Sequence, residues 1–300
     1  MKTYYVDTAR TTLNKRRQKT HVVFDGERVF KAWKLTDLKD AGEVFIDTLF
    51  PENYDEVLEL LKNNVKIYLL KNTAVLKRLR LENDARKSDE NDALMLSKIP
   101  RDNYRLLTVD EIELKITVRP LINRYEMLTK WRKMLKQWLD DCDIPEIVEA
   151  LKENIKVLEK MLYRVSREII DVVKNSNSMY SYVYKEVANF LDVNDSVILA
   201  ILILETPLYL DIYKLKALYG YTPNKNNGRY NHRLRTLISS LAANIYITAK
   251  RKGIKNEKFK EFIEKMDKRK AIYKIEIEIL KIIWKTFIKT SNKSETEPAG

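Results

Sequence analysis

Two short apolar runs near the start of the chain each end in an aspartate. Residues 3–7 read TYYVD and end at Asp7, and residues 44–47 read VFID and end at Asp47. Runs of β-branched and aromatic residues of this length are typical of buried strands. The pattern predicts an α/β region in which two strand ends carry a carboxylate.

A third acidic feature lies in residues 87–94, KSDENDAL. Ser88 suits the N-cap of a helix, and Asp89 and Asp92, three residues apart, then share one face of its first turn. For this pair alone, attraction to the positive end of the helix dipole is a sufficient explanation. Two carboxylates on one face repel unless a cation compensates them. Together with Asp7 and Asp47 the pair favours a Mg²⁺ site, because Mg²⁺ prefers oxygen ligands and serves phosphodiester chemistry.

The composition narrows the kinds of site and partner. The single cysteine, Cys142, excludes an internal disulfide and a cysteine-based zinc site, and two histidines, His21 and His232, are too few to favour a histidine-rich metal centre. A metal would therefore be held by carboxylates. The formal net charge of +13 is typical of proteins with a polyanionic partner, most often nucleic acid, although solubility alone also explains a basic surface.

The order of elements in the first hundred residues is informative. We expect a strand at 3–6, a hairpin of strands 21–24 and 28–33 around Asp25-Gly26, a strand at 43–47, a helix at 54–62, a strand at 65–70, and a basic helix at 72–81 before the acidic one. Antiparallel strands followed by strand–helix alternation and a late acidic helix form the order of the ribonuclease-H-like fold. In that fold, carboxylates from the first strand, the fourth strand and a late helix meet at one sheet edge.

The remainder is predicted to be mostly helical. Residues 108–174 carry two apolar stripes, Leu121–Trp138 and Ile147–Ile169, which suit two long antiparallel helices or a coiled-coil surface for self-association. A polar loop at 220–230 separates helical segments 198–218 and 232–250. A basic amphipathic helix is expected at 257–288, followed by a disordered tail.

Several motifs resemble one known family, the DEDD transposases of bridge-RNA-guided insertion sequences. Residues 87–93, KSDENDA, resemble the family signature K-T-D-x-x-D-A, and residues 5–8, YVDT, its opening I-D-V-S. Residues 45–47, FID, lie where the family has E-x-T-G, with Tyr54 as the tyrosine shortly after. Residues 218–223, LYGYTP, resemble G-L-x-P, and residues 231–235, NHRLR, resemble N-x-x-L-R.

The resemblance implies a fold, an activity and partners. It implies a RuvC-like domain at 1–105, a helical arm or coiled coil at 106–183, a transposase domain at 184–252, a C-terminal basic helix at 253–290 and a tail at 291–300. Asp7, Asp47, Asp89 and Asp92 would be the catalytic, metal-binding tetrad for one or two Mg²⁺ ions. Such enzymes recombine the DNA of element ends and targets, use a structured guide RNA, and act as homo-oligomers, here a dimer or tetramer.

Two positions depart from the family pattern. The second acid is Asp47 where the family has glutamate, and Glu52 is a rival for that role. Asn226-Asn227-Gly228 stands where the family has its catalytic serine, and an amide is not a nucleophile for covalent DNA cleavage. Two other readings therefore stay open: a transposase-derived protein that only binds nucleic acid, and a RuvC-like junction nuclease.

Basic residues recur in each predicted module and form a candidate track for phosphate contacts. The candidates are Arg10, Arg16, Arg17, Lys77, Arg78, Arg80, Lys225, Arg229, Arg233 and Arg235. No apolar run approaches the roughly 20 residues that a membrane-spanning helix needs, so we expect a cytoplasmic protein with no membrane contact.

Overall fold

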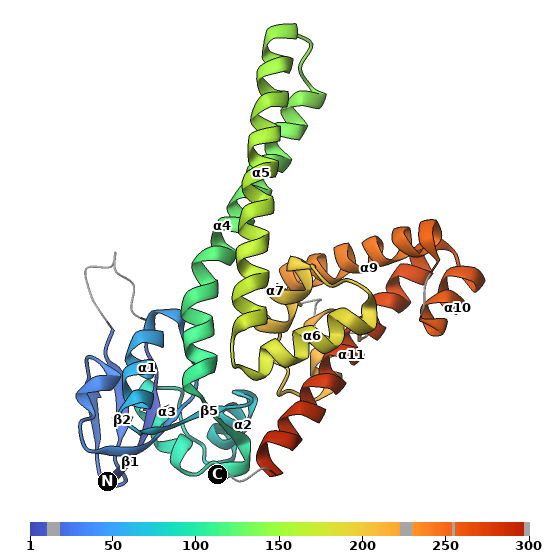
Figure 1. Cartoon of the computed structure of the whole chain (residues 1–300). Coiled ribbons are helices and arrows are strands. Elements are labelled where there is room, and N and C mark those ends of the chain that lie inside the picture. Colours follow the sequence, from blue (N-terminus) through green and yellow to red (C-terminus); the bar gives the residue numbers. More distant parts are fainter. Residues whose placement is uncertain (11–18, 223–229, 254–255, 297–300) are drawn as a thin grey trace. The chain divides into compact units, whose positions relative to one another are not determined.

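The computed structural model describes residues 1–10, 19–222, 230–253 and 256–296 (Figure 1). The chain divides into two compact units, Met1–Ile116 and Thr117–Gly300. The first is an α/β unit and the second is helical. Within the described residues, no helix combines the length and the apolar character needed to cross a membrane.

The first unit is built on a mixed sheet of strand order β3-β2-β1-β4-β5-β6. Its strands are β1 (Lys2–Asp7), β2 (His21–Phe24), β3 (Val29–Ala32), β4 (Ala41–Ile46), β5 (Lys66–Leu70) and β6 (Tyr104–Leu106). The first three strands pair antiparallel, β4 lies parallel to both β1 and β5, and β6 pairs antiparallel with β5. The predicted strands are present, and the short edge strand β6 was missed.

The hairpin between β2 and β3 forms where the Asp25-Gly26 dipeptide predicts it. Gly26 has φ +98°, a conformation that side chains disfavour. The Asp25 carboxylate accepts hydrogen bonds from the backbone N–H groups of Glu27 and Arg28. This local bonding closes the turn independently of the rest of the sheet.

Helices cover both faces of the sheet, because alternate side chains of each strand point to opposite sides. On one face Val44, Ile46 and their neighbours pack with α1 (Tyr54–Lys62) and with the start of α4 (Val109–Asp140). On the other face, Phe45 packs with residues of α2 (Ala74–Glu82) and α3 (Asp89–Ser97). Phe45 also stacks on Tyr68, with ring centroids 4.6 Å apart.

The second unit consists of helices around a strongly apolar core. They are α5 (Pro145–Asn175), α6 (Met179–Leu191), α7 (Val197–Glu205), α8 (Ile212–Leu218), α9 (His232–Lys252), α10 (Glu257–Lys265) and α11 (Lys268–Thr296), together with α4 from Thr117 onward. Helix α7 is buried nearly all round and packs against α5, α6 and α9. Helix α11 packs along α6 and α9.

Three predicted helical boundaries differ from the structure. The segment 198–218 is two helices, because Pro207 follows α7 and has no N–H to continue it. The segment 257–288 is also two helices, and the Asp267 carboxylate accepts a hydrogen bond from the Lys270 N–H at the new start. The tail predicted from residue 291 is helical up to Thr296, because no glycine or proline interrupts α11 before Pro298.

The two apolar stripes predicted on α4 and α5 are only partly buried in the second unit. On α5 the members Ile155, Leu162, Val165 and Ile169 are buried. Stripe members near the other ends of the two helices stay exposed, Ile147 on α5 at 46% and Trp131 and Trp138 on α4 at 45% and 52%. Beside these two tryptophans on α4, Met127 and Met134 are 43% and 38% exposed. An ion pair between Lys136 and Glu159, at 3.2 Å, links the outer parts of α4 and α5. The stripe on α4 is therefore partly core and partly free surface.

Candidate functional site

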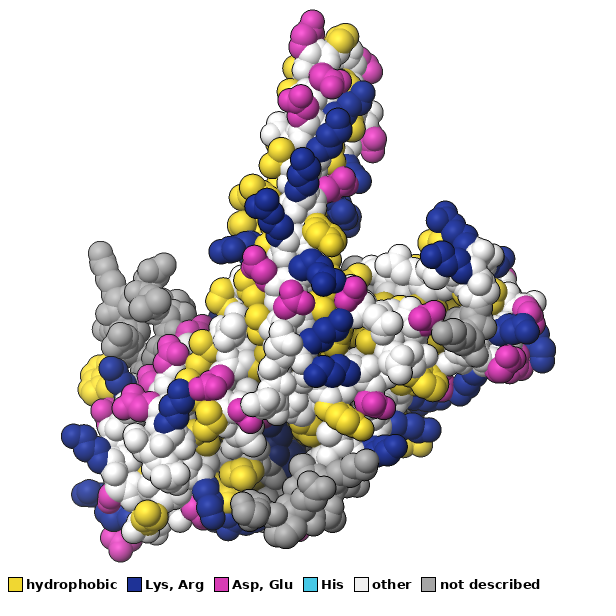
Figure 2. All heavy atoms as spheres, viewed as in Figure 1, with side chains coloured by type: hydrophobic (Ala, Val, Ile, Leu, Met, Phe, Trp, Pro, Cys, Tyr) yellow, Lys and Arg dark blue, Asp and Glu magenta, His cyan; other side chains and the backbone are white. Residues whose placement is uncertain are grey.

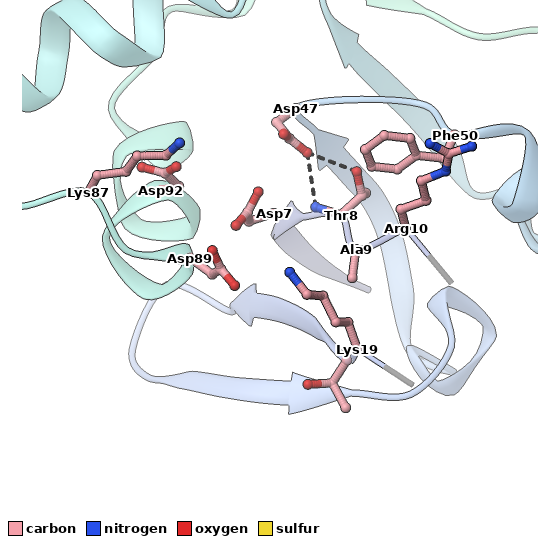
Figure 3. Close-up of a pocket in the computed structure, with 11 residues that line it drawn as sticks. Asp7, Thr8, Ala9, Arg10, Lys19, Asp47, Phe50, Lys87, Asp89 and Asp92 are labelled. Carbon is pink, nitrogen blue, oxygen red and sulfur yellow. Dashed lines mark hydrogen bonds between the residues drawn. The ribbon is translucent and has the colours of Figure 1, made fainter. Parts of the chain in front are cut away.

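All four aspartates singled out in the sequence line one pocket of the first unit, with a volume of about 510 Å³ (Figure 3). They come from the end of β1 (Asp7), the residue after β4 (Asp47) and the first turn of α3 (Asp89 and Asp92). The other residues that line the pocket are Thr8, Ala9, Arg10, Lys19, Thr20, Phe50 and Lys87. Positions up to 85 residues apart in the chain are thus brought to one place.

Parallel strand pairing places Asp7 beside Asp47. Val6 lies opposite Ile46 in the register of β1 and β4, so the next residue of each strand emerges at the same edge. The backbone N–H of Asp47 donates to the Val6 carbonyl at 3.4 Å. This edge is formed by the carboxyl ends of parallel strands, where α/β sheets commonly bind ligands.

Thr8 fixes the orientation of the Asp47 side chain. Its backbone N–H donates to Asp47 Oδ1 at 2.9 Å, and its hydroxyl lies 2.9 Å from the same oxygen. The Thr48 hydroxyl donates to Oδ2 at 3.0 Å. Both carboxylate oxygens of Asp47 are therefore oriented by neighbouring donors.

Two buried polar residues hold the backbone just beyond Asp7. The Ala9 N–H donates to His21 Nδ1 at 3.0 Å, and Asn53 Nδ2 donates to the Ala9 carbonyl at 3.4 Å. His21 and Asn53 are both fully buried. Burial lowers the pKa of His21, which favours the neutral ring that can accept at Nδ1. Sequence reasoning missed both residues, although a histidine that opens the apolar strand HVVF is a usable signal.

Local capping positions the helical pair. The Ser88 hydroxyl accepts a hydrogen bond from the Asn91 N–H at 3.1 Å, which starts α3 at Asp89. Helix α3 packs against β1 and β2, so its first turn faces the end of β1. Asp89 is exposed at the mouth of the pocket, whereas Asp92 is buried.

Arg80 of α2 is bound to one of the four carboxylates. Its Nη1 donates to both Oδ1 and Oδ2 of Asp92, at 2.8 Å each. The guanidinium is an internal counter-ion for a buried acid. Arg80 therefore neutralises Asp92 within the first unit.

The four acids of the pocket also repel one another. Burial, and then the negative charges of Asp47, Asp89 and Asp92, raise the pKa of Asp7 to about 8. Burial also raises the pKa of Asp92, against the opposing effect of Arg80. A carboxyl group that stays protonated near neutral pH marks a place where another positive charge would be stabilising.

The donor set suits Mg²⁺, because it consists of carboxylate oxygens only. As the side chains stand, however, no group of three or more His, Cys, Asp or Glu residues in the described ranges is arranged to hold a metal ion. Mutual repulsion, and the pairing of Asp92 with Arg80, are physical reasons for this spread. Binding an ion would require the carboxylates to draw together.

The structure distinguishes the two candidates for the second acid. Asp47 lines the pocket, and Glu52 does not. Glu52 Oε1 instead accepts a hydrogen bond from Arg10 Nε at 3.0 Å, so this acid neutralises a pocket cation. The geometry favours Asp47 as the acid that accompanies Asp7.

The candidate phosphate-binding residues fall into distinct groups. Arg10 lines the pocket, and Lys77 and Arg78 are exposed on α2. Three arginines instead bind internal carboxylates: Arg80 binds Asp92, Arg233 binds Glu126 and Glu205, and Arg235 binds Glu276. Four candidates and the asparagine step lie outside the described residues: Arg16, Arg17, Lys225, Arg229 and Asn226-Asn227-Gly228.

Comparison with models of protein families finds no family that matches this chain, and comparison with curated proteins finds no similar sequence.

Proposed function

We propose that this chain is a Mg²⁺-dependent enzyme that cleaves phosphodiester bonds in DNA. The observation that carries the proposal is the convergence of Asp7, Asp47, Asp89 and Asp92 on one pocket. These residues were selected from sequence patterns alone, and their distances along the chain make a shared pocket unexpected unless the fold is built around it. Lys19 and Lys87 add positive charge to the same pocket, which suits a phosphate group.

The strand topology supports a ribonuclease-H-like, and more narrowly RuvC-like, assignment for the first unit. The order β3-β2-β1-β4-β5 has three antiparallel strands followed by two parallel additions. Acids at the ends of β1 and β4 and on a helix after β5 occupy the places that this fold uses for metal binding. The extra edge strand β6 and the long helix α4 follow that core.

Each side chain has a defined role in the proposed chemistry. Asp7 and Asp47 would bind the metal from the sheet edge, and Asp89 and Asp92 from the helix. Thr8 orients Asp47, while His21 and Asn53 hold the Ala9 backbone next to Asp7. When bound, Mg²⁺ would activate a hydroxyl and stabilise charge on the leaving oxygen.

The family resemblance narrows the proposed substrate to the DNA ends and target of an insertion sequence, with a structured RNA as guide. Motifs at residues 87–93, 218–223 and 231–235 support this narrower proposal. This narrower proposal includes self-association of the chain through the exposed apolar residues of α4, because recombinases act as oligomers. The stripe residues Trp131 and Trp138 are the natural contacts.

One sequence feature favours a second candidate, a RuvC-like nuclease without strand exchange. Asn226-Asn227-Gly228 stands in place of the family serine, so covalent attachment to DNA lacks its expected nucleophile. Hydrolysis by water needs only the carboxylate pocket of the first unit. A third outcome, binding of nucleic acid without cleavage, would indicate a transposase-derived protein that has lost catalytic activity.

The test uses purified full-length protein with Mg²⁺ and three DNA substrates: linear duplex, a four-way junction, and element ends with their adjacent RNA. Strand exchange or a covalent adduct supports the transposase, and junction hydrolysis supports the nuclease. Asp7→Asn and Asp89→Asn should abolish either activity. The matched control is Asp55→Asn, an exposed acid in the first turn of α1 and outside the pocket. Equal activity of all three variants would refute the proposed site.

A further inference from the structure

More than half of the net charge of the chain lies in a short stretch near its C-terminal end. Residues 250–274 contain eleven Lys and Arg and four Asp and Glu, a formal net charge of +7, against +13 for all 300 residues. This stretch belongs to the second unit, whereas the residues of the carboxylate pocket belong to the first. Metal binding by the pocket carboxylates gives no reason for this accumulation of positive charge.

Three helices bring these charges together. Gly253, with φ +77°, ends α9, and the Asn256 side chain caps α10 by accepting from the N–H groups of Lys258 and Phe259. Helices α9, α10 and α11 contact one another, and Phe259 is fully buried between them. Figure 2 shows dark blue Lys and Arg side chains gathered over this end of the second unit.

Two of the four acids in this stretch, and Glu278 just beyond it, form ion pairs with nearby lysines. Glu261 pairs with Lys265 and Asp267 with Lys270, while Glu278 pairs with Lys258. A further set of exposed cations has no ion pair among the described residues, and we call it the basic edge. It consists of Arg251, Lys252, Lys260, Lys268, Arg269 and Lys274.

Stability of the helices explains only part of this arrangement. Arg251 and Lys252 lie at the C-terminus of α9, where the helix dipole favours cations. Lys268 and Arg269 lie in the first turn of α11, where the dipole disfavours them, and the acid that precedes that turn, Asp267, already pairs with Lys270. Helix stability therefore does not explain the positive charge at the start of α11. This charge is better explained by binding of an anionic partner.

We propose that the basic edge binds the phosphate backbone of nucleic acid without reading its sequence. Cations without partners, spread over three helices, suit a polymer with regularly spaced negative charges. A membrane surface suits the region less well, because helices that bind membranes expose an apolar face. Here the apolar side chains Phe259, Ala271 and Ile275 are fully buried in the helical core.

The test compares two triple variants of the full chain. Arg251→Gln, Lys260→Gln and Arg269→Gln together remove one unpaired cation from each helix. The control variant combines Lys258→Gln, Lys265→Gln and Lys270→Gln, which removes the same charge from positions already in ion pairs. Binding of a fluorescent random-sequence DNA duplex is measured by anisotropy over a range of salt concentrations. EDTA is present, so that cleavage does not contribute.

Removing three phosphate contacts should lower the slope of log K against log salt by about 2.7. Between about 50 and 200 mM salt the wild-type chain would then lose roughly fortyfold more affinity than the variant. The control variant should keep a slope near that of the wild-type chain. The thermal unfolding temperature of the test variant should change little, because losing Arg251 at the C-terminus of α9 offsets removing Arg269 from the first turn of α11.

Three results would overturn the proposal. They are no duplex binding by the wild-type chain, an equal loss in the two variants, and binding to phosphatidylserine vesicles but not to DNA. The outcome is independent of the proposed catalysis, because Asp7→Asn should leave this binding intact while abolishing cleavage. Failure of the basic edge and failure of the carboxylate pocket are therefore distinguishable.

Discussion

Arg80 on α2 and Asp92 on α3 form a buried ion pair that engages one carboxylate of the candidate metal site. One guanidinium nitrogen lies 2.8 Å from each carboxylate oxygen, and the side chains are only 15% and 10% exposed. A proposed metal ligand is thus neutralised by a protein cation. Metal binding and this ion pair compete for the same oxygens.

Replacing Arg80 with alanine should therefore have opposite effects on stability and on metal binding. Without metal, Asp92 is left buried and unpaired, which should lower the free energy of unfolding by about 3–5 kcal/mol above neutral pH. Mg²⁺ affinity, measured by calorimetry, should rise several-fold because the competing cation is gone. Arg78→Ala is the control, since Arg78 pairs with the exposed Glu82 on the same helix. Unchanged or weaker Mg²⁺ binding by the Arg80 variant would contradict the competition.

Asp7 should make the metal-free protein less stable as the pH rises. Its pKa is raised from 3.8 to about 8 in the folded chain, so the folded state holds the proton more tightly than the unfolded state. The stabilising contribution of protonated Asp7 is fully present below about pH 4 and is lost as the pH approaches 8. Asp7→Asn removes this dependence.

The measurement is the free energy of unfolding of the wild type and Asp7→Asn across that pH range in EDTA. The advantage of the variant should grow toward pH 8, on the order of 1–3 kcal/mol after allowance for partial exposure to solvent. Adding Mg²⁺ should flatten or reverse the trend for the wild type. A difference between the two proteins that does not vary with pH would show that Asp7 titrates normally.

Thr8→Val should weaken metal binding without disrupting the strand. The change keeps the shape and the backbone N–H but removes the hydroxyl that lies 2.9 Å from Asp47 Oδ1. Loss of such an orienting contact typically costs ten- to a hundredfold in metal affinity. Thr73→Val, at an exposed position before α2, is the comparison because its side chain makes no capping bond. Equal Mg²⁺ affinities of the two variants would show that the Thr8 hydroxyl has no role in metal binding.

The exposed stripe on α4 should mediate self-association. Met127, Trp131, Met134 and Trp138 are spaced by four, three and four residues, the pattern of a coiled-coil surface. Trp131→Glu with Trp138→Glu should shift the mass measured by light scattering toward that of one chain. Tyr163→Glu, at a 68% exposed aromatic on α5, should not shift it. A wild-type chain that is monomeric at all concentrations would end this prediction.

Much of the first unit was predictable because its signals are local. Short apolar runs identified β1, β4 and β5, Asp25-Gly26 identified the hairpin turn, and Ser88 identified the start of α3. The edge strand β6 was missed because three residues carry too little periodic signal, and its pairing with β5 depends on a contact distant in sequence.

The sequence by itself determined which acids end strands, which begin a helix, and where positive charge accumulates, because these depend on neighbouring residues. Only the tertiary structure decided that Asp47 rather than Glu52 lines the pocket, that Arg80 faces Asp92, and that Arg235 faces Glu276. Those relations depend on the packing of segments remote in the chain. Charge and burial act through space, so no pattern along the polypeptide encodes the partner of a given side chain.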